Sequence, residues 1–163
     1  MTSQDLVNLY EFSYSAIKRN LEGLSHEDTL VSPPGGGNCI NWVLGHMLAA
    51  RGAIHKLAGA SPIEGSEIVA RYGRGSEPLK PGEAPADLAT LRGFLDDSQL
   101  VLITTLAALS EDALNAEIPE KLRRPPLVGN VGQGLARLAS HESYHNGQIG
   151  VLRRLAGKEA AIR

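Results

Sequence analysis

Apolar residues recur at steps of three and four in four separate parts of this chain. In the first part, Leu6, Tyr10, Ile17 and Leu21 follow this spacing, which places them on one face of a helix. The same periodicity predicts amphipathic helices over four segments: Ser3–Leu24, roughly Asn38–Ala58, Ala86–Leu109 and Val131–Ala156.

Helix start and stop signals fit these four segments. We predict Ser3 and Asn38 as N-caps and Gly157 as a C-cap. Glycines and prolines separate the segments, above all in the long crossover Gly59–Pro85, which carries no strong helix or strand pattern. The loop before the last helix contains Pro119, Pro125 and Pro126. No segment shows the alternation of a strand, so the pattern predicts an all-α protein, a four-helix bundle.

Length and composition favour one domain. With 163 residues and 42% hydrophobic content, we expect a single domain over residues 1–163. The formal net charge of −2 lacks the basic surplus that nucleic-acid binding needs. The chain has one cysteine, Cys39, and neither a signal-like nor a membrane-spanning apolar run. We therefore expect a cytoplasmic protein that acts on a small-molecule substrate, with no nucleic-acid or membrane partner.

Candidate chemistry is concentrated in the last predicted helix, at His141-Glu142-Ser143-Tyr144-His145. Histidines four residues apart stand one turn apart on the same helix face and could share a metal ion, although a structural pair has the same spacing. The segment also spells the His-Glu-x-x-His of zinc proteases, in which the glutamate is the general base. The Gly and His of the longer His-x-x-Gly-x-x-His motif are replaced by Gln148 and Val151, and no strand is predicted to hold a peptide, so this interpretation is disfavoured.

A third histidine, His46, occupies a matching position in the second helix. His46 lies six residues before Gly52 and eight before Ile54, as His141 does before Gly147 and Ile149. This similarity, together with similar segments Leu24–Leu30 and Leu109–Leu114, suggests a helical hairpin used twice. In a duplicated bundle, His46 and His141 would lie at corresponding levels on facing helices. Taken alone, a histidine at this position would more often be a core residue hydrogen-bonded to backbone than a metal ligand.

The remaining polar and aromatic candidates have plainer alternatives. We predict that His55 faces solvent and that neither it nor His26 is a ligand. Gln148, one turn beyond His145, is a candidate catalytic residue that could hydrogen-bond a metal-bound water or orient a ligand, or it could simply fill a polar gap. Trp42, one turn before His46, could line a pocket or pack in the core. Glu142 is a candidate catalytic residue, with a solvated or pocket-edge acid as the commoner role. Cys39 is expected to pack rather than react.

Three histidine ligands would leave coordination positions open, as in catalytic rather than structural metal sites. Such an ion could acidify a water molecule or bind a substrate thiol as thiolate. Imidazole ligands suit Zn²⁺, Ni²⁺ and Fe²⁺ alike, so the residues do not identify the metal.

Together these motifs resemble a known family. Trp42-Val43-Leu44-Gly45-His46, and His141 to Ile149 followed by Leu152-Arg153-Arg154, are similar to the signatures of the DinB-like (DinB/YfiT) metal-binding bundles. The resemblance spans essentially the whole chain. It implies a four-helix bundle with a long crossover between the second and third helices, often a homodimer, in which His46, His141 and His145 bind a divalent metal, commonly zinc or nickel.

The resemblance also guides the functional hypothesis. Characterised relatives include S-transferases and isomerases that use low-molecular-weight thiols, so we expect a metal-dependent, thiol-dependent transferase. The alternatives are a metal-dependent hydrolase and a non-catalytic metal-binding or stress-associated protein. Folding of Arg71, Tyr72 and Arg74 over the metal would favour an anionic substrate and make Arg71 and Trp42 cofactor-binding residues.

Overall fold

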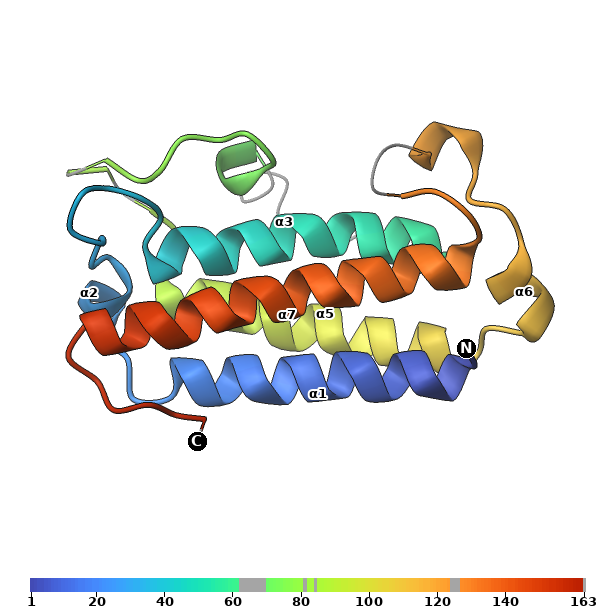
Figure 1. Ribbon diagram of the computed structural model, residues 1–163, viewed down its shortest axis with the longest axis horizontal. Coiled ribbons are helices and arrows are strands. Elements are labelled where there is room, and N and C mark those ends of the chain that lie inside the picture. Colours follow the sequence, from blue (N-terminus) through green and yellow to red (C-terminus); the bar gives the residue numbers. More distant parts are fainter. Residues whose placement is uncertain (62–69, 81, 84, 124–126, 163) are drawn as a thin grey trace.

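The computed structural model describes residues 1–61, 70–80, 82–83, 85–123 and 127–162. Parts of the predicted crossover, and Pro125 and Pro126, therefore lie outside the described residues. The four long helices lie side by side along the long axis of the molecule (Figure 1). They are α1 (Ser3–Leu21), α3 (Ile40–Ala58), α5 (Leu88–Ala107) and α7 (Val131–Leu155).

The four helices close into a bundle in which α7 and α5 each pack against both α1 and α3. Following the colours in Figure 1, α1 and α7 run in one direction and α3 and α5 in the other. Because α3 and α5 are parallel, their connection must return along the length of the bundle. This return explains the long crossover that the sequence predicts.

Short helices that the periodicity did not reveal lie in the connections: α2 (His26–Thr29), α6 (Glu111–Asn115) and η1 (Glu120–Leu122). Ser25 caps α2 and Ser110 caps α6, each accepting a hydrogen bond from the backbone N–H three residues later. These are corresponding positions in the two similar halves, so the resemblance between the halves extends to local structure. Residues 70–72 of the crossover are also helical. The described residues contain no strand, only an isolated bridge between Glu117 and Asn130.

Helix boundaries differ from the predictions by one to three residues. Thr2, rather than Ser3, caps α1, because Thr2 and Asp5 form a reciprocal capping box. Helix α3 begins one residue later than expected, with Cys39 and not Asn38 at the N-cap position. Gly157 follows α7 with a φ of 78°, a left-handed conformation that suits a residue without Cβ.

The buried interior consists of two apolar clusters, one containing Ile17, Met47, Leu95 and Ile149, and the other containing residues such as Leu102. Between them lie five buried polar residues, which we call the polar layer: Ser13 of α1, Arg51 of α3, Ser98 and Gln99 of α5, and Glu142 of α7. Each long helix contributes to this layer near its middle. No helix in the described part of the chain is long and apolar enough to cross a membrane.

Candidate metal centre

Helices α3 and α7 bring the three predicted histidines together. The ring centroids of His46 lie 5.4 Å from His141 and 4.9 Å from His145, and those of His141 and His145 are 4.4 Å apart. One ligand nitrogen from each residue lies within 4.8 Å of the others. Among the described residues, this is the group of His, Cys, Asp or Glu side chains that could hold a metal ion.

Hydrogen bonds orient two of the three rings. Nδ1 of His46 donates to the backbone carbonyl of Tyr72 at 2.9 Å, and Nδ1 of His145 donates to Oε1 of Gln148 at 2.7 Å. A proton on Nδ1 leaves the Nε2 lone pair of a neutral imidazole free. Such bonds to carbonyl and amide oxygens are the usual supports of metal-binding histidines.

The nitrogen spacing fits a shared cation. Nε2 of His141 and Nε2 of His145 are 3.1 Å apart. Two imidazole nitrogens bound to one zinc ion at about 2.05 Å, with an angle between about 90° and 110°, would be separated by about 2.9–3.4 Å. The donor set therefore fits a divalent metal in both chemistry and spacing.

The surroundings of His141 and His145 favour their neutral form. Burial lowers the pKa of His141 to about 4, assisted by His145 and His46 and opposed by Glu142. Burial also lowers the pKa of His145, with His46 contributing, although the bond to Gln148 acts in the opposite direction. Since only unprotonated imidazole binds metal, the lowered pKa values of His141 and His145 favour binding of a cation.

Trp42 and Gln148 both lie beside the histidines. The Trp42 ring stacks on His46, with centroids 5.0 Å apart and an interplanar angle of 11°, and its indole N–H donates to Glu77 O at 3.0 Å. Trp42 is also 7% exposed, so it packs in the core and lines the centre at once. Gln148 Nε2 donates to Tyr144 Oη at 3.3 Å in addition to the contact with His145.

The crossover touches the centre through Tyr72. This residue is 1% exposed, its ring lies against Gly45, and its hydroxyl donates to Asn41 Oδ1 at 2.8 Å. The Tyr72 carbonyl thereby reaches His46. Arg71 does not extend a free guanidinium: it forms an ion pair with Glu83, with Nη2 2.9 Å from Oε2, and donates to Glu77 O at 3.0 Å. Arg74 is exposed.

Glu142 does not have the predicted environment. Its side chain is 0% exposed, so the expectation of a solvated or pocket-edge acid was wrong. The carboxylate accepts from Arg51 Nε at 2.7 Å and from Ser13 Oγ at 3.0 Å. A carboxylate bound in this way is not placed as the general base of a zinc protease. The error arose because Glu142, and not His141, lies on the most buried stripe of α7.

Arg51 is a residue that the sequence reasoning missed. It is fully buried and also donates to Ser98 Oγ and to Gln99 Oε1, both at 2.9 Å. A detectable signal existed. Arg51 shares a helical stripe with the apolar Met47 and Ile54, and Glu142 shares one with Leu138 and Ile149. Opposite charges on two buried stripes indicate a buried pair.

His55 was also misplaced. It is 1% exposed rather than facing solvent, with Nδ1 2.8 Å from Ser61 O and Nε2 3.1 Å from Ser98 O. Helix α3 packs against α5, and His55 lies near the end of α3, where the Ser98 carbonyl of α5 is its backbone partner. His26 lies on α2, and the group of three histidines does not include it. Cys39 is buried, and burial raises the pKa of its thiol, consistent with packing.

A groove of about 540 Å³ adjoins the centre. Tyr144 and Gln148 line it on α7, together with Gly147 and Val151, and Val43 lines it on α3. Pro33, Asn38, Leu152 and Leu155 complete its described wall, and among these residues no side chain is charged. Gln148 belongs to both the groove and the histidine cluster.

Comparisons with known proteins agree with this architecture. The structure superposes on a crystal structure of a conserved protein from Enterococcus faecalis with a TM-score of 0.71, covering 97% of this chain and 99% of that one. The two sequences are 17% identical, so this likeness concerns the fold. No curated protein matches the chain. The family model of the DinB superfamily matches residues 9–149. The chain therefore belongs to the DinB superfamily, and the predicted four-helix, all-α architecture is confirmed.

Proposed function

We propose that this protein is a metal-dependent enzyme in which His46, His141 and His145 bind zinc or nickel. In its reaction the sulfur of a low-molecular-weight thiol bonds to a carbon of a small electrophile and displaces a leaving group such as chloride, and the thiol proton passes to water. The observation that carries the proposal is the set of three converging imidazoles without a fourth protein ligand in the described group. Such a set resembles catalytic metal sites, which keep a coordination position for a substrate. When bound, the cation would supply the positive charge that favours the thiolate form of a thiol.

The residues of the chain have separate roles in this proposal. Gln148 and the Tyr72 carbonyl hold the Nδ1 protons of His145 and His46, so that both Nε2 atoms remain available. Trp42 keeps one face of His46 away from water through the stacked contact. Glu142 and Arg71 are both engaged in ion pairs, so neither is assigned a step.

The groove supports an apolar acceptor substrate. Its described wall offers Val43, Val151 and Leu152 together with the amides of Asn38 and Gln148, but no charge. A volume of about 540 Å³ lies within the range of small-molecule sites. The carboxylates and amines of common cellular thiols would find no counter-charge there. We therefore assign the groove to the body of an uncharged electrophile.

A transferase assay tests the proposal. Zinc- or nickel-loaded protein would be incubated with glutathione, bacillithiol or mycothiol and the uncharged bimane electrophile monochlorobimane, and the conjugate measured by fluorescence. Metal-dependent conjugation that is lost in a His46→Ala variant supports the proposal. Ester hydrolysis without thiol would replace it by a hydrolase, and stoichiometric metal binding without turnover by a binding protein.

A variant in the groove tests the acceptor site separately from metal binding. Gly147 lines the groove, and no atom lies within 4 Å of a Cβ added there. Gly147→Leu should therefore fill the groove without disturbing the fold, raising KM for the electrophile while leaving metal content unchanged. An unaltered KM would exclude this groove as the acceptor site.

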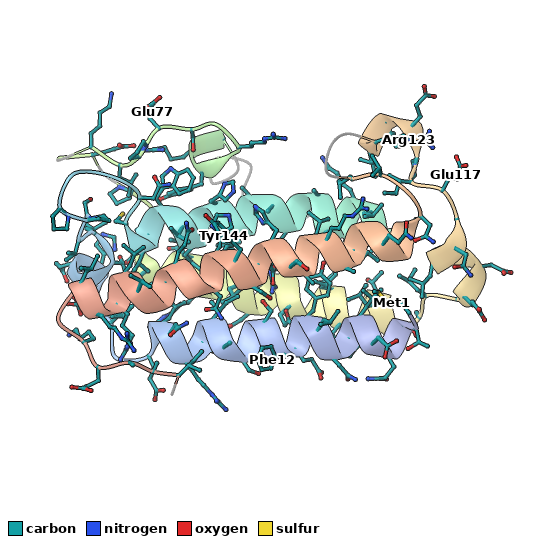
Figure 2. All side chains as sticks on the ribbon, viewed as in Figure 1. Met1, Phe12, Glu77, Glu117, Arg123 and Tyr144 are labelled. Carbon is teal, nitrogen blue, oxygen red and sulfur yellow. The ribbon has the colours of Figure 1, made fainter. Side chains whose placement is uncertain are left out.

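We further propose that the protein is cytoplasmic and, as the family resemblance implies, a homodimer. The surface that suits a second copy is an exposed apolar region on α7 and α1. Phe12 and Tyr144, labelled in Figure 2, are 74% and 66% exposed, and Val151 is 61% exposed. Phe12 and Val151 line the same hollow between α1 and α7, and exposed apolar side chains that lie together are typical of protein interfaces.

A further inference from the structure

The ion pair between Arg51 and Glu142 is buried more completely than stability alone explains. Both side chains are 0% exposed, and Nη2 of Arg51 lies 3.3 Å from Oε2 of Glu142 in addition to the 2.7 Å contact of Nε with Oε1. Removing two charges from water is costly, and packed apolar residues of similar volume often stabilise a fold as well or better. The pair therefore calls for a role other than holding the bundle together.

Its location suggests that role. Arg51 follows His46 by five residues on α3, about 7.5 Å along the helix axis. Glu142 directly follows His141 on α7 and precedes His145 by three residues. The ion pair thus joins the same two helices that carry the three imidazoles.

The pair fixes the rotation of α7 as well as its position. At about 100° per residue, His141, His145 and Gln148 all lie within about 60–120° of Glu142, on the same side of it. When Glu142 points at Arg51, these three residues must face the region beside α3. A rotation or slide of α7 that moved the histidines would also break the bonds to Arg51.

The remaining helices hold the pair in place. Ser98 and Gln99 of α5 accept from the Arg51 guanidinium, and Ser13 of α1 donates to Glu142. Gln99 Nε2 also donates to the Tyr10 carbonyl of α1 at 3.3 Å. These bonds are directional, whereas the apolar clusters on either side can accommodate small slides. Metal sites tolerate errors of only about 0.2 Å in ligand distance, so directional support has a purpose.

We propose that Arg51 and Glu142 are positioning residues for the three-histidine centre: their buried ion pair sets the register and rotation of α7 against α3 on which metal affinity depends. This inference rests on the proposed metal binding. It assigns the polar layer to the metal centre rather than to folding.

The test compares metal binding by the wild type and by the volume-matched double variant Arg51→Met/Glu142→Leu. Zinc affinity is measured by competition with a chromophoric chelator, and coordination geometry by the visible absorption spectrum of the cobalt(II) form. We expect zinc affinity to fall about 10-fold or more, the size of effect seen for supporting residues in metal sites, with an altered cobalt spectrum. Circular dichroism and thermal unfolding establish that the variant is folded.

Two further variants make the result specific. Leu102→Ala removes a buried apolar side chain of α5 and destabilises the bundle without touching the pair, so its zinc affinity and cobalt spectrum should match the wild type. Glu142→Gln retains the shape but not the charge. If the double variant does not fold, Glu142→Gln should still weaken zinc binding by about threefold or more, a smaller loss than full removal of a supporting residue.

The outcomes separate this inference from the proposed function. Wild-type zinc affinity and cobalt spectra in folded Arg51→Met/Glu142→Leu, or in Glu142→Gln where the double variant is unfolded, would overturn the inference alone. An equal loss of affinity in Leu102→Ala would also overturn it, because the effect would then follow general stability. Absence of zinc binding by the wild type would overturn both.

Discussion

Near the metal centre, Gly45 is the glycine at which an added Cβ should lower the stability of the protein most. A Cβ built on Gly45 would lie 2.4–2.6 Å from three atoms of the Tyr72 ring, far inside van der Waals contact. Tyr72 is buried and cannot swing into solvent without giving up its partners. Gly45→Ala should therefore displace Tyr72 and the crossover segment that carries it.

The magnitude follows from the hydrogen bonds of Tyr72. Its hydroxyl donates to Asn41 Oδ1 at 2.8 Å and accepts from Ala86 N at 3.0 Å, and its carbonyl accepts from His46 Nδ1 at 2.9 Å. At about 1 kcal/mol each, losing three bonds costs about 3 kcal/mol. Alanine recovers about 1 kcal/mol through its better helix propensity. We expect a net loss of about 2 kcal/mol in the free energy of unfolding, within the usual range for overpacking.

Gly52→Ala is the matched control on the same helix. Nothing lies within 4 Å of a Cβ added at Gly52, so only helix propensity should act. The control should be more stable than the wild type by up to about 1 kcal/mol. Urea unfolding followed by circular dichroism measures both variants, provided that the m-value is unchanged.

A double-mutant cycle tests the cause. In a Tyr72→Ala background the ring is absent, so adding Gly45→Ala should no longer destabilise the protein. Gly45→Ala in the wild-type background should also weaken zinc binding, because His46 loses the acceptor that holds its Nδ1 proton. If Gly45→Ala is as stable as Gly52→Ala, the proposed contact between Tyr72 and Gly45 is refuted.

Three further predictions concern the centre and the surface. Gln148→Leu should weaken zinc affinity about 10-fold by removing the acceptor of His145 Nδ1, whereas Tyr144→Phe should leave it unchanged; equal affinities by calorimetry would contradict this role. Because the pKa of His141 is lowered to about 4 in the fold against 6.5 when unfolded, the unfolded chain takes up protons first, and metal-free stability should fall as pH decreases from about 6.5 towards 4. Urea unfolding should show a weaker fall for His141→Gln, and a rise on acidification would contradict the sign. Val151→Glu should convert the proposed dimer to a monomer in light-scattering measurements, and an unchanged mass would exclude this surface.

The helical periodicity was sufficient to predict the architecture. Four apolar stripes and the Gly and Pro breaks between them located every long helix, because burial of one face is what stabilises such helices. The short helices α2 and α6 escaped because one turn is too brief to show periodicity. Their serine caps, repeated at Ser25 and Ser110, were the available signal.

The grouping of the histidines was predictable because helix geometry relates residues four apart, and the repeated pattern related His46 to His141. Orientation within the bundle was not predictable to the same degree. The pattern favours an inward histidine and an outward glutamate, yet Glu142 is buried and His141 only partly so. A buried charge depends on a partner distant in sequence, here Arg51, and periodicity carries no information on such pairs.

The backbone contacts of the metal centre likewise could not be predicted from the sequence pattern. The Tyr72 carbonyl reaches His46 only because the crossover returns along α3 and its tyrosine fits against Gly45. Arg71 was expected near a ligand, but the nearby Glu83 provides a closer charge. The ion pair with Glu83 therefore determines where the Arg71 side chain lies.

Metal content tests the central claim most directly. The protein would be purified without an affinity tag or added metal, and its zinc and nickel measured by mass spectrometry beside His46→Ala and the control His26→Ala. We predict close to one ion per chain in the wild type and in His26→Ala, and little metal in His46→Ala, because two imidazoles alone hold a divalent ion poorly. Equal metal content in all three proteins would contradict the three-histidine centre.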